Sequence, residues 1–577
     1  MGVPGFFAWL LKKYKENKII LHSMKYPADI LYLDANCLFH PQSQKVIEYF
    51  NKLKDPEKLE EKILKRIIKY INFLIEIVGP REEVFIAVDG VAPLAKMNQQ
   101  RKRRFKSTYD NKLKSKIKEK YKIPNNTIWN NTTITPGTLF MERLHNKIKE
   151  YISSNKIKIT YSSYHTPGEG EHKILQDIKN RGEKIFVIYG LDADLIFLSL
   201  ASQKRDIFLL REAIQFNSNA NKEINMGGDF MEDVFEELNF VSIDTMRKCI
   251  NDEFYQRIDR KYEERGERSL QEDIDFTNDF VLICYLLGND FLPHLPSIDI
   301  KTGGLDFIID NYVEIFVQIY ATVTRLTDKS FEINNIFLEM LLESLSNSEN
   351  FYFETIFPRY LESISKRKCL SSDPYENALW ELENLRGIEI DDPIKLGYDS
   401  ADLWKFRYYE YYFGESGSQN SMIDKICSEY FRGIKWIAQY YFDQCPSWDW
   451  QYPFSNPPFI SDLYKYFSER KIDFDQIIFK NSAPSEPFIQ LLAVLPAECT
   501  SLLPSNYRHL ITAPSSEIID FYPRAFKIDM INKDMYWKCL PLLPTVDLKR
   551  IKDAVKNIKL SEEEKVRNKI LNNYKNF

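Results

Sequence analysis

Three short apolar runs in this sequence each lead into acidic residues, and this pattern limits the fold more strongly than any other feature. The runs are residues 30–33 before Asp34, residues 84–88 before Asp89, and residues 184–190 before Asp192 and Asp194. Stretches with helical periodicity, such as residues 57–78 and 138–153, separate them. Continuous apolar strands that alternate with helices are typical of a parallel sheet buried on both faces. The sequence therefore predicts an α/β fold with a mostly parallel central sheet flanked by helices.

The acidic residues after these runs are candidates for a shared site. In open parallel sheets, ligands bind in the crevice outside the carboxyl ends of the strands, which is where all four aspartates would lie. A single aspartate in such a place more often caps a helix. Because three strands end in the same way, helix capping explains the whole set poorly, and we expect a common ligand.

A second acidic pair, Glu169 and Glu171, stands in the stretch Thr166-Pro-Gly-Glu-Gly-Glu-His-Lys173. The pair would lie in the first turn of a helix over residues 169–180, where acids ordinarily compensate the helix dipole. The glycine between the two acids lets the backbone approach a ligand closely, which favours a binding role. A further acid, Asp290, follows an apolar helix that ends at Gly288.

Seven carboxylates are thus candidate catalytic groups and metal ligands: Asp34, Asp89, Glu169, Glu171, Asp192, Asp194 and Asp290. Carboxylates that lie close together repel one another unless a cation lies between them. Oxygen ligands without His or Cys suit Mg²⁺ or Mn²⁺ rather than zinc. We expect two Mg²⁺ ions, which Mn²⁺ could replace, and a two-metal mechanism of phosphodiester hydrolysis.

A strongly basic segment begins just after Asp89. Residues 96–122 hold twelve Lys or Arg and only two acidic residues, although the whole chain of 577 residues has a net charge of −5. On a helix over residues 93–122, four polar side chains would share one face: Lys96, Gln100, Arg103 and Arg104. Lysine-rich helices are usually only solvated. The glutamine among the cations and the origin of the helix beside Asp89 favour a phosphate pocket next to the metals.

An aromatic-rich region contains Trp436, Trp448 and Trp450. Most of its rings are expected in the core, and one or two could stack on bases without sequence preference. His40, six residues after Asp34, could face such a ring across a base, although a lone histidine is more often structural.

Several motifs resemble those of the Xrn-type 5′→3′ exoribonucleases. They occur in order along nearly the whole chain and include Asp89-Gly-Val-Ala-Pro93, Pro167-Gly-Glu-Gly-Glu-His-Lys173, Tyr189-Gly-Leu-Asp-Ala-Asp194, Leu287-Gly-Asn-Asp-Phe-Leu-Pro293 and Ser447-Trp-Asp-Trp450. The stretch Asp34-Ala-Asn-Cys-Leu-Phe-His40 departs from the family's usual Asp-Met-Asn-Gly-Ile-Ile-His but keeps both ends.

The resemblance implies a metal-dependent nuclease domain of the PIN and flap-nuclease type over residues 1–310. A helical connecting segment over 311–395 would follow, and then a largely helical second conserved region over 396–577 that closes the active-site pocket. It also implies that the seven acids hold both metals and that the basic stripe holds a 5′-monophosphate. Bases would stack between His40 and a tryptophan, for which Trp448 is favoured over Trp450 and Trp436.

These expectations together predict a processive, Mg²⁺-dependent 5′→3′ exoribonuclease. Its substrate would be single-stranded RNA with a 5′-monophosphate, and its products nucleoside 5′-monophosphates. One alternative is a structure-specific DNA flap nuclease of the same fold, which would follow its last acid with a Gly-rich helix-hairpin segment, whereas Asp290 leads into Phe-Leu-Pro-His-Leu-Pro. Another is a catalytically inactive RNA-binding scaffold, which would have no need of all seven acids.

The rest of the composition bounds the cellular setting. The eight cysteines include no CxxC pair, and no run of about 18 apolar residues occurs,. We expect a soluble, intracellular monomer with reduced thiols and no membrane contact, in either the cytoplasm or the nucleus.

Overall fold

The computed structural model describes most of the chain. The described residues are 3, 5–124, 129–212, 230–231, 234, 236–267, 273–326, 331–414, 419–571 and 575–576. Among the helices of this part, none is both long enough and apolar enough to cross a membrane.

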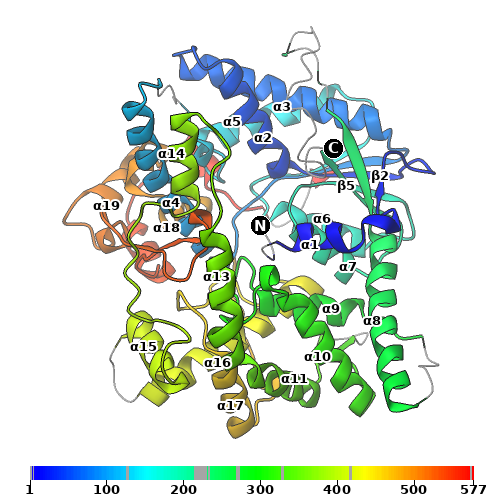
Figure 1. Cartoon of the computed structure of the whole chain (residues 1–577). Helices are drawn as coiled ribbons and strands as arrows, with labels where there is room; N and C mark the ends of the chain where they lie inside the picture. Colours follow the sequence, from blue (N-terminus) through cyan, green and yellow to red (C-terminus); the bar gives the residue numbers. More distant parts are fainter. Residues whose placement is uncertain are drawn as a thin grey trace.

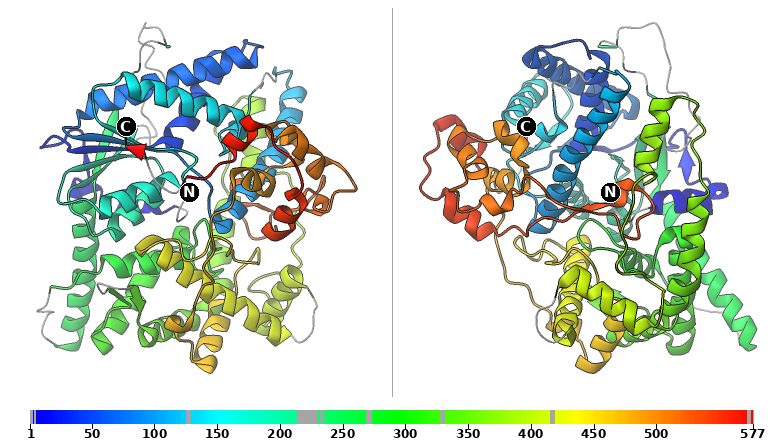
Figure 2. Two further views of the ribbon diagram at one scale, coloured as in Figure 1. Left: turned by 180° about the vertical axis from the view of Figure 1, so that it is seen from behind. Right: turned by 60° about the vertical axis from the view of Figure 1, so that its left-hand side comes forward.

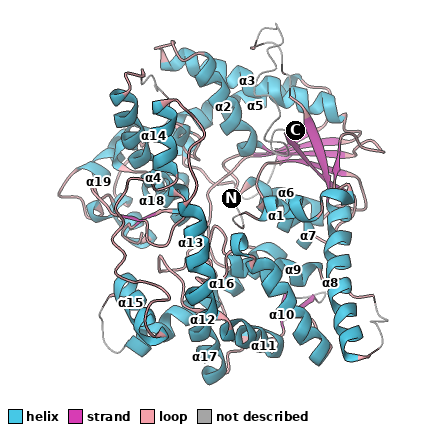
Figure 3. Cartoon of the chain, in the orientation of Figure 1, coloured by secondary structure: helices cyan, strands magenta, loops and turns pink. Residues whose placement is uncertain are grey.

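A central sheet of eight strands organises the N-terminal half (Figures 1 and 3). Five neighbouring strands are parallel, in the order β6 (Ile207–Glu212), β5 (Phe186–Tyr189), β2 (Ile30–Asp34), β3 (Glu83–Ala87) and β4 (Ile159–Ser162). Antiparallel strands border them: β7 (Leu238–Ser242) and β1 (Ile20–Leu21) on one side, and β12 (Lys575–Asn576) on the other. This arrangement confirms the predicted fold class.

The two faces of the sheet are covered by different helices, as side chains alternate along each strand. Leu31 and Leu33 of β2 pack in a core with α2 (Ala35–Tyr49), α3 (Pro56–Val78) and α5 (Leu139–Ser154). Ile30 and Tyr32 point to the other face, into a core that includes α6 (Gly170–Lys179) and α7 (Asp194–Ala201). Figure 1 shows the sheet between these two helical layers.

The second core continues far beyond the sheet without a break near residue 310. It includes side chains from several further helices: α1 (Phe6–Lys13), α8 (Ile243–Arg265), α9 (Thr277–Cys284), α10 (Gly304–Ile319), α11 (Asn335–Asn347), α16 (Gln419–Phe442) and α17 (Ile460–Arg470).

The part of 311–395 that the structure describes is mainly helical, with α12 (Glu349–Phe351), α13 (Phe357–Ser365) and α14 (Pro374–Glu383), but also contains a hairpin of β8 (Thr324–Leu326) and β9 (Phe331–Ile333). The proposed domain boundaries stay predictions.

The long basic helix α4 (Leu94–Lys120) joins the two halves of the chain. Leu94, Met97 and Phe105 pack in a third core with four C-terminal elements: α18 (Pro487–Val494), η8 (Ala497–Leu502), α19 (Arg508–Thr512) and α20 (Leu548–Val555). Figure 2 shows these C-terminal helices gathered on one side of the molecule, next to α4. Another element, α15 (Ala401–Phe413), belongs to a separate aromatic cluster around Trp404.

Candidate active site

The acids of the first two strands meet the start of α6. Asp34 is the last residue of β2 and is buried, and Asp89 follows β3 by two residues. The Asp89 carboxylate accepts a hydrogen bond of 2.7 Å from the Gly170 backbone N–H. A Cβ on Gly170 would lie 2.8 Å from Asp34 Oδ1, so only glycine lets α6 come this close. Gly170 therefore allows the N-terminal end of α6 to pack directly against Asp34 and Asp89.

Glu169 and Glu171 are buried at the N-terminal end of α6. The Tyr440 hydroxyl of α16 donates a hydrogen bond of 2.7 Å to Glu169 Oε1. Glu171 Oε2 is buried without a hydrogen-bond partner. Burial raises the pKa of Glu171 well above its usual value, and the neighbouring Asp194 and Glu169 raise it further. Such an acid favours a cation as its missing partner.

Asp192 and Asp194 stand between β5 and α7. Asp194 is the first residue of α7 and is buried. Burial raises its pKa to about 6, and the Asp290 and Asp192 carboxylates also raise it. The Asp192 backbone carbonyl accepts a hydrogen bond of 2.6 Å from Arg211 of β6, which fixes the turn that carries both acids.

Lys96 lies directly among the acids. Its ammonium group is 2.5 Å from Glu169 Oε2 and 2.9 Å from Asp290 Oδ2. Burial would lower the pKa of Lys96, but Asp290 and Glu169 outweigh it and raise the pKa well above its usual value. Burial would likewise raise the pKa of Asp290, whereas Lys96 lowers it to about 2. The residue predicted to bind phosphate thus also acts as a counter-ion of the acid cluster.

The structure brings all seven predicted acids into electrostatic contact. Burial raises the pKa of Asp34 well above its usual value, and Asp89, Asp192 and Glu169 add to this effect. Burial raises the pKa of Asp89 to about 6, again with help from Glu169. Within the described residues, no three His, Cys, Asp or Glu side chains converge into a finished metal-ligand group. The donors are nevertheless all carboxylate oxygens, and their mutual repulsion and the unpartnered Glu171 Oε2 fit a hard divalent cation.

Lys173 is a second buried cation beside the acids, and it was not predicted in this role. Its ammonium group donates hydrogen bonds to the backbone carbonyls of Val88 (2.6 Å) and Ser163 (3.1 Å). Burial lowers its pKa to about 7, against the opposing effect of Asp89. Lys173 thus ties α6 to the ends of β3 and β4.

The other residues of the predicted basic stripe lie further along α4. Arg104 donates a hydrogen bond of 2.8 Å to Thr135 Oγ1, while its other terminal nitrogen is buried without a partner. Gln100 Oε1 accepts a hydrogen bond of 3.3 Å from Gln490 of α18, and Arg103 is exposed. His40 of α2 is close to both arginines: burial lowers its pKa to about 4, and Arg103 and Arg104 lower it too. His40 is therefore neutral at neutral pH and lies beside two cationic side chains.

The three candidate tryptophans differ in their surroundings. Trp436 is fully buried, and its ring is stacked with that of Trp450 at 5.5 Å between centroids. Trp448 is only partly buried, and its backbone carbonyl accepts a hydrogen bond of 2.8 Å from the Leu94 N–H at the start of α4. The structure therefore places Trp448 next to the helix that carries the basic stripe, whereas Trp436 and Trp450 belong to the core.

Two side chains that join α4 to the C-terminal half, Arg101 and Gln490, were not foreseen. Arg101 is buried, although it lies in the basic segment, and donates hydrogen bonds to the carbonyls of Ala493 and Phe521. Gln490 accepts a hydrogen bond of 2.9 Å from the Ala92 N–H and also holds Gln100. No local pattern could reveal these contacts because the partners lie about 400 positions apart in the chain.

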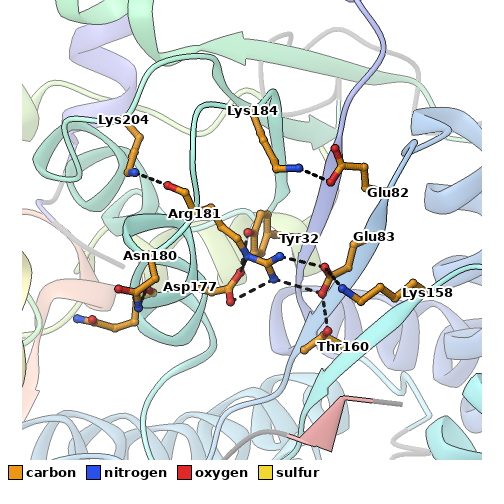
Figure 4. Close-up of polar contacts among 11 residues, drawn as sticks. Tyr32, Glu82, Glu83, Lys158, Thr160, Asp177, Asn180, Arg181, Lys184 and Lys204 are labelled. Carbon is orange, nitrogen blue, oxygen red and sulfur yellow. Dashed lines mark hydrogen bonds and ion pairs between the residues drawn. The ribbon is translucent and has the colours of Figure 1, made fainter.

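A polar network fixes the opposite end of α6 (Figure 4). Arg181 contacts Glu83 of β3 at 3.1 Å and Asp177 of α6 at 2.9 Å. Glu83 also accepts from Lys158, and Tyr32 of β2 donates to Asp177 at 2.8 Å. Because α6 carries Glu169 and Glu171 at its other end, this network sets the position of both acids relative to the sheet.

Comparisons with known proteins identify the family of this chain. Residues 1–213 match the family described as "XRN 5'-3' exonuclease N-terminus", and residues 271–372 and 362–575 match the family described as "Xrn1 helical domain". The chain therefore belongs to the Xrn family of 5′→3′ exonucleases.

Three curated relatives illustrate the similarity. The human 5'-3' exoribonuclease 1 is 33% identical over 98% of this chain, but the match covers only 35% of the human protein. The 5'-3' exoribonuclease 2 of Candida albicans is 30% identical over 98% of the chain and 74% of its own length. The 5'-3' exoribonuclease 2 homolog of Drosophila melanogaster is 30% identical over 100% of the chain and 73% of its own length.

Proposed function

We propose that this protein is a 5′→3′ exoribonuclease that degrades single-stranded RNA bearing a 5′-monophosphate. It would do so processively and release nucleoside 5′-monophosphates. The observation that carries the proposal is the arrangement of α4, which touches the acid cluster through Lys96 and presents Arg103 and Arg104 seven and eight residues later. At 1.5 Å per residue this separation is on the order of 10 Å along the helix axis, which leaves room for about one nucleotide.

The acid cluster would hold Mg²⁺, and we propose two ions on Asp34, Asp89, Glu169, Glu171, Asp192, Asp194 and Asp290. When bound, such ions stabilise the attacking and leaving oxygens of a phosphodiester displacement. The protein supplies the orientation of the ligands. Tyr440 holds Glu169, the Gly170 N–H holds Asp89, and Arg211 holds the turn of Asp192.

The cationic pocket would recognise the 5′-terminal phosphate. Arg104 is already fixed by Thr135 and keeps one buried terminal nitrogen without a partner, so a phosphate oxygen could complete its hydrogen bonding,. The neutral His40 beside it would stack on a base, opposite Trp448, without attracting a further charge. Because this pocket receives a terminal phosphate, a cap or an internal nucleotide should fit poorly, which would make the enzyme depend on a free 5′ end.

One assay tests the proposal directly. Purified protein with Mg²⁺ is given RNAs of identical sequence with a 5′-monophosphate, a 5′-hydroxyl or a 5′-triphosphate, alongside a flapped DNA. We expect rapid decay of the monophosphorylated RNA alone, with mononucleotide products and few intermediates. Equal decay of the three RNAs would contradict the phosphate pocket. Cleavage of the DNA alone would favour a flap nuclease, and no cleavage at all would favour a binding scaffold.

A further inference from the structure

Two histidines and a glutamate lie together outside the cluster of seven acids. Glu142 and His145 stand one turn apart on α5, and His165 lies in the turn that follows β4. The centroids of the two imidazole rings are 5.2 Å apart, and Glu142 Oε2 is 3.8 Å from His165 Nε2. The proposed RNA chemistry uses none of these three side chains.

The hydrogen bonding of His165 fixes which of its two ring nitrogens carries a proton. Nδ1 lies 2.8 Å from the backbone carbonyl of Lys569, which can only accept, so Nδ1–H is the donor,. Burial lowers the pKa of His165 below its usual value, so the ring is neutral at neutral pH and Nε2 presents a lone pair,. This lone pair faces Glu142 Oε2, a second acceptor. Two facing acceptors call for a cation between them.

The other two side chains are held by hydrogen bonds that leave them able to bind the same cation. Glu142 accepts from the Tyr164 hydroxyl through Oε2 and from Asn146 through Oε1. His145 Nδ1 is 3.1 Å from the Tyr161 hydroxyl, which leaves Nε2 for another partner, and burial lowers the pKa of His145 to about 4. Neutral imidazoles with the other nitrogen hydrogen-bonded, and carboxylates that are themselves hydrogen-bonded, are the usual ligands of transition metals.

We propose that Glu142, His145 and His165 bind a zinc ion, with a water molecule as the fourth ligand. Nitrogen and oxygen donors of this kind suit zinc. Two imidazoles on a tetrahedral zinc ion have their ring centroids about 5 Å apart, which agrees with the spacing of these rings,. Glu142 and His145 are only partly buried, so an ion can reach the site.

Binding would include a small movement of the ligands. Among the described residues, no three such side chains already form a finished metal-ligand group. Neighbouring ligand atoms on a tetrahedral zinc ion are about 3.3 Å apart, so the gap of 3.8 Å between Glu142 and His165 has only to close slightly,.

The ion would join three parts of the chain. Two ligands belong to α5, and the third, His165, precedes Glu169 by four residues. The His165 carbonyl also accepts a hydrogen bond of 2.9 Å from the Leu571 N–H, so the C-terminal segment is attached at the same place. The role of the ion is therefore structural, and it does not depend on the RNA chemistry proposed above.

Zinc binding to the whole chain can be measured by competition with a chromophoric chelator. An excess of Mg²⁺ is present, because the seven acids would otherwise take up zinc. We expect one Zn²⁺ per chain with a Kd below about 1 μM. Glu142→Gln and His145→Gln should each weaken binding at least about 100-fold, because each removes a ligand. Zinc should raise the unfolding temperature of the parent but not that of either variant.

A matched control is a histidine at another edge of the sheet. His22 is exposed, and its Nδ1 lies 2.8 Å from Asn239 Oδ1 of β7. His22→Gln should bind zinc as the parent does. Cobalt gives a second measurement on the parent alone: Co²⁺ in place of zinc should show the strong visible absorption of a tetrahedral site.

Unchanged zinc binding by both variants would overturn the site, since the ion would then lie at the acids or at cysteines. Absence of zinc binding by the parent would overturn it as well. If a variant fails to fold, the cobalt spectrum decides, and a purely octahedral spectrum would refute the proposal. A parent that binds zinc through these three side chains but degrades no RNA would support the site and contradict only the proposed function.

Discussion

The ammonium group of Lys96 can satisfy either the acids or a phosphate, but it cannot serve both at full strength. In the protein alone it pairs with Glu169 and Asp290. Divalent cations bound to the same carboxylates would compete with it, and a displaced Lys96 would become available to the RNA. This exchange would make Mg²⁺ and the 5′-phosphate support each other's binding, and such coupling is reciprocal.

The exchange predicts opposite effects of one substitution. Lys96→Met should bind Mg²⁺ about tenfold more tightly in the absence of RNA, because a competing charge is gone. The same variant should lose the linkage by which a 5′-phosphorylated oligonucleotide raises Mg²⁺ affinity. Calorimetric titration measures both, with Lys102→Met as a control on the same helix. Weaker Mg²⁺ binding by Lys96→Met would instead mean that the lysine holds the acids in place.

Two other side chains should separate cutting from end recognition. Asp192→Ala should reduce turnover by several orders of magnitude and retain RNA binding, because it removes a candidate metal ligand at the edge of the cluster. Arg103→Ala should leave cutting possible but reduce the preference for a 5′-monophosphate over a 5′-hydroxyl about tenfold. Rates with the two RNAs check both statements. Equal effects of the two variants on preference would contradict the assignment.

At the scale of elements, contacts at both ends fix the position of α6. Its N-terminal end carries the acids, while Arg181, just beyond its C-terminal end, is fixed by Glu83 and Asp177 (Figure 4). The helix cannot shift along its axis without breaking one of these contacts. Loss of the contacts around Arg181 should therefore disturb the positions of Glu169 and Glu171, which lie about three helical turns away.

The network predicts a pH-dependent contribution to stability. Burial raises the pKa of Glu83, but hydrogen bonds from Arg181 and Lys158 lower it below its usual value of 4.5. A carboxylate with a lowered pKa stabilises the fold above pH 4.5, and this contribution is lost as the pH falls through the folded-state pKa. Glu83→Gln should cost about 2–3 kcal/mol at pH 7 and much less at low pH. Urea unfolding at both pH values measures this, and a difference independent of pH would exclude the ion pair as its cause.

Some elements of the fold and of the site could be predicted from the sequence, and others could not. The acids after β2, β3 and β5, the helix α6 and the basic helix α4 all follow from local patterns, since periodicity and a terminal acid are local properties. Strands β4 and β6 escaped notice because no acid of the set follows them. Tyr440, Gln490 and Arg101 escaped because their partners are hundreds of residues away, and such pairs depend on how the two halves pack.

At the scale of the whole molecule, α4 holds the two halves together. Arg101 is a buried part of this junction: it lies over the rings of Phe105 and Tyr522 and donates hydrogen bonds to two carbonyls of the C-terminal half. Burial lowers its pKa to about 10, so it stays charged at neutral pH. A buried charge that is satisfied only by backbone carbonyls makes this junction sensitive to substitution.

Arg101→Met should destabilise the protein by about 2–4 kcal/mol, because the carbonyls of Ala493 and Phe521 lose their partner. Thermal unfolding measures the loss. Limited proteolysis should show faster cleavage in the C-terminal half than in the sheet. Arg103→Ala, two residues away but exposed, is the matched control and should change neither. Equal destabilisation by both variants would mean that stability depends on the positive charge of α4 and not on the contacts of Arg101 with the C-terminal half.

The short segment between Asp89 and α4 has a mechanical consequence. Its backbone is hydrogen-bonded to Gly168, the residue before Glu169, through Gly90 and Val91. It is hydrogen-bonded to the C-terminal half through Ala92 and Leu94. These hydrogen bonds hold the two halves together beside the acid cluster, and the halves cannot separate unless the bonds break together. If the proposed RNA substrate runs between the two halves here, it would have to enter by its free end, and we expect a circular RNA of the same sequence to resist degradation.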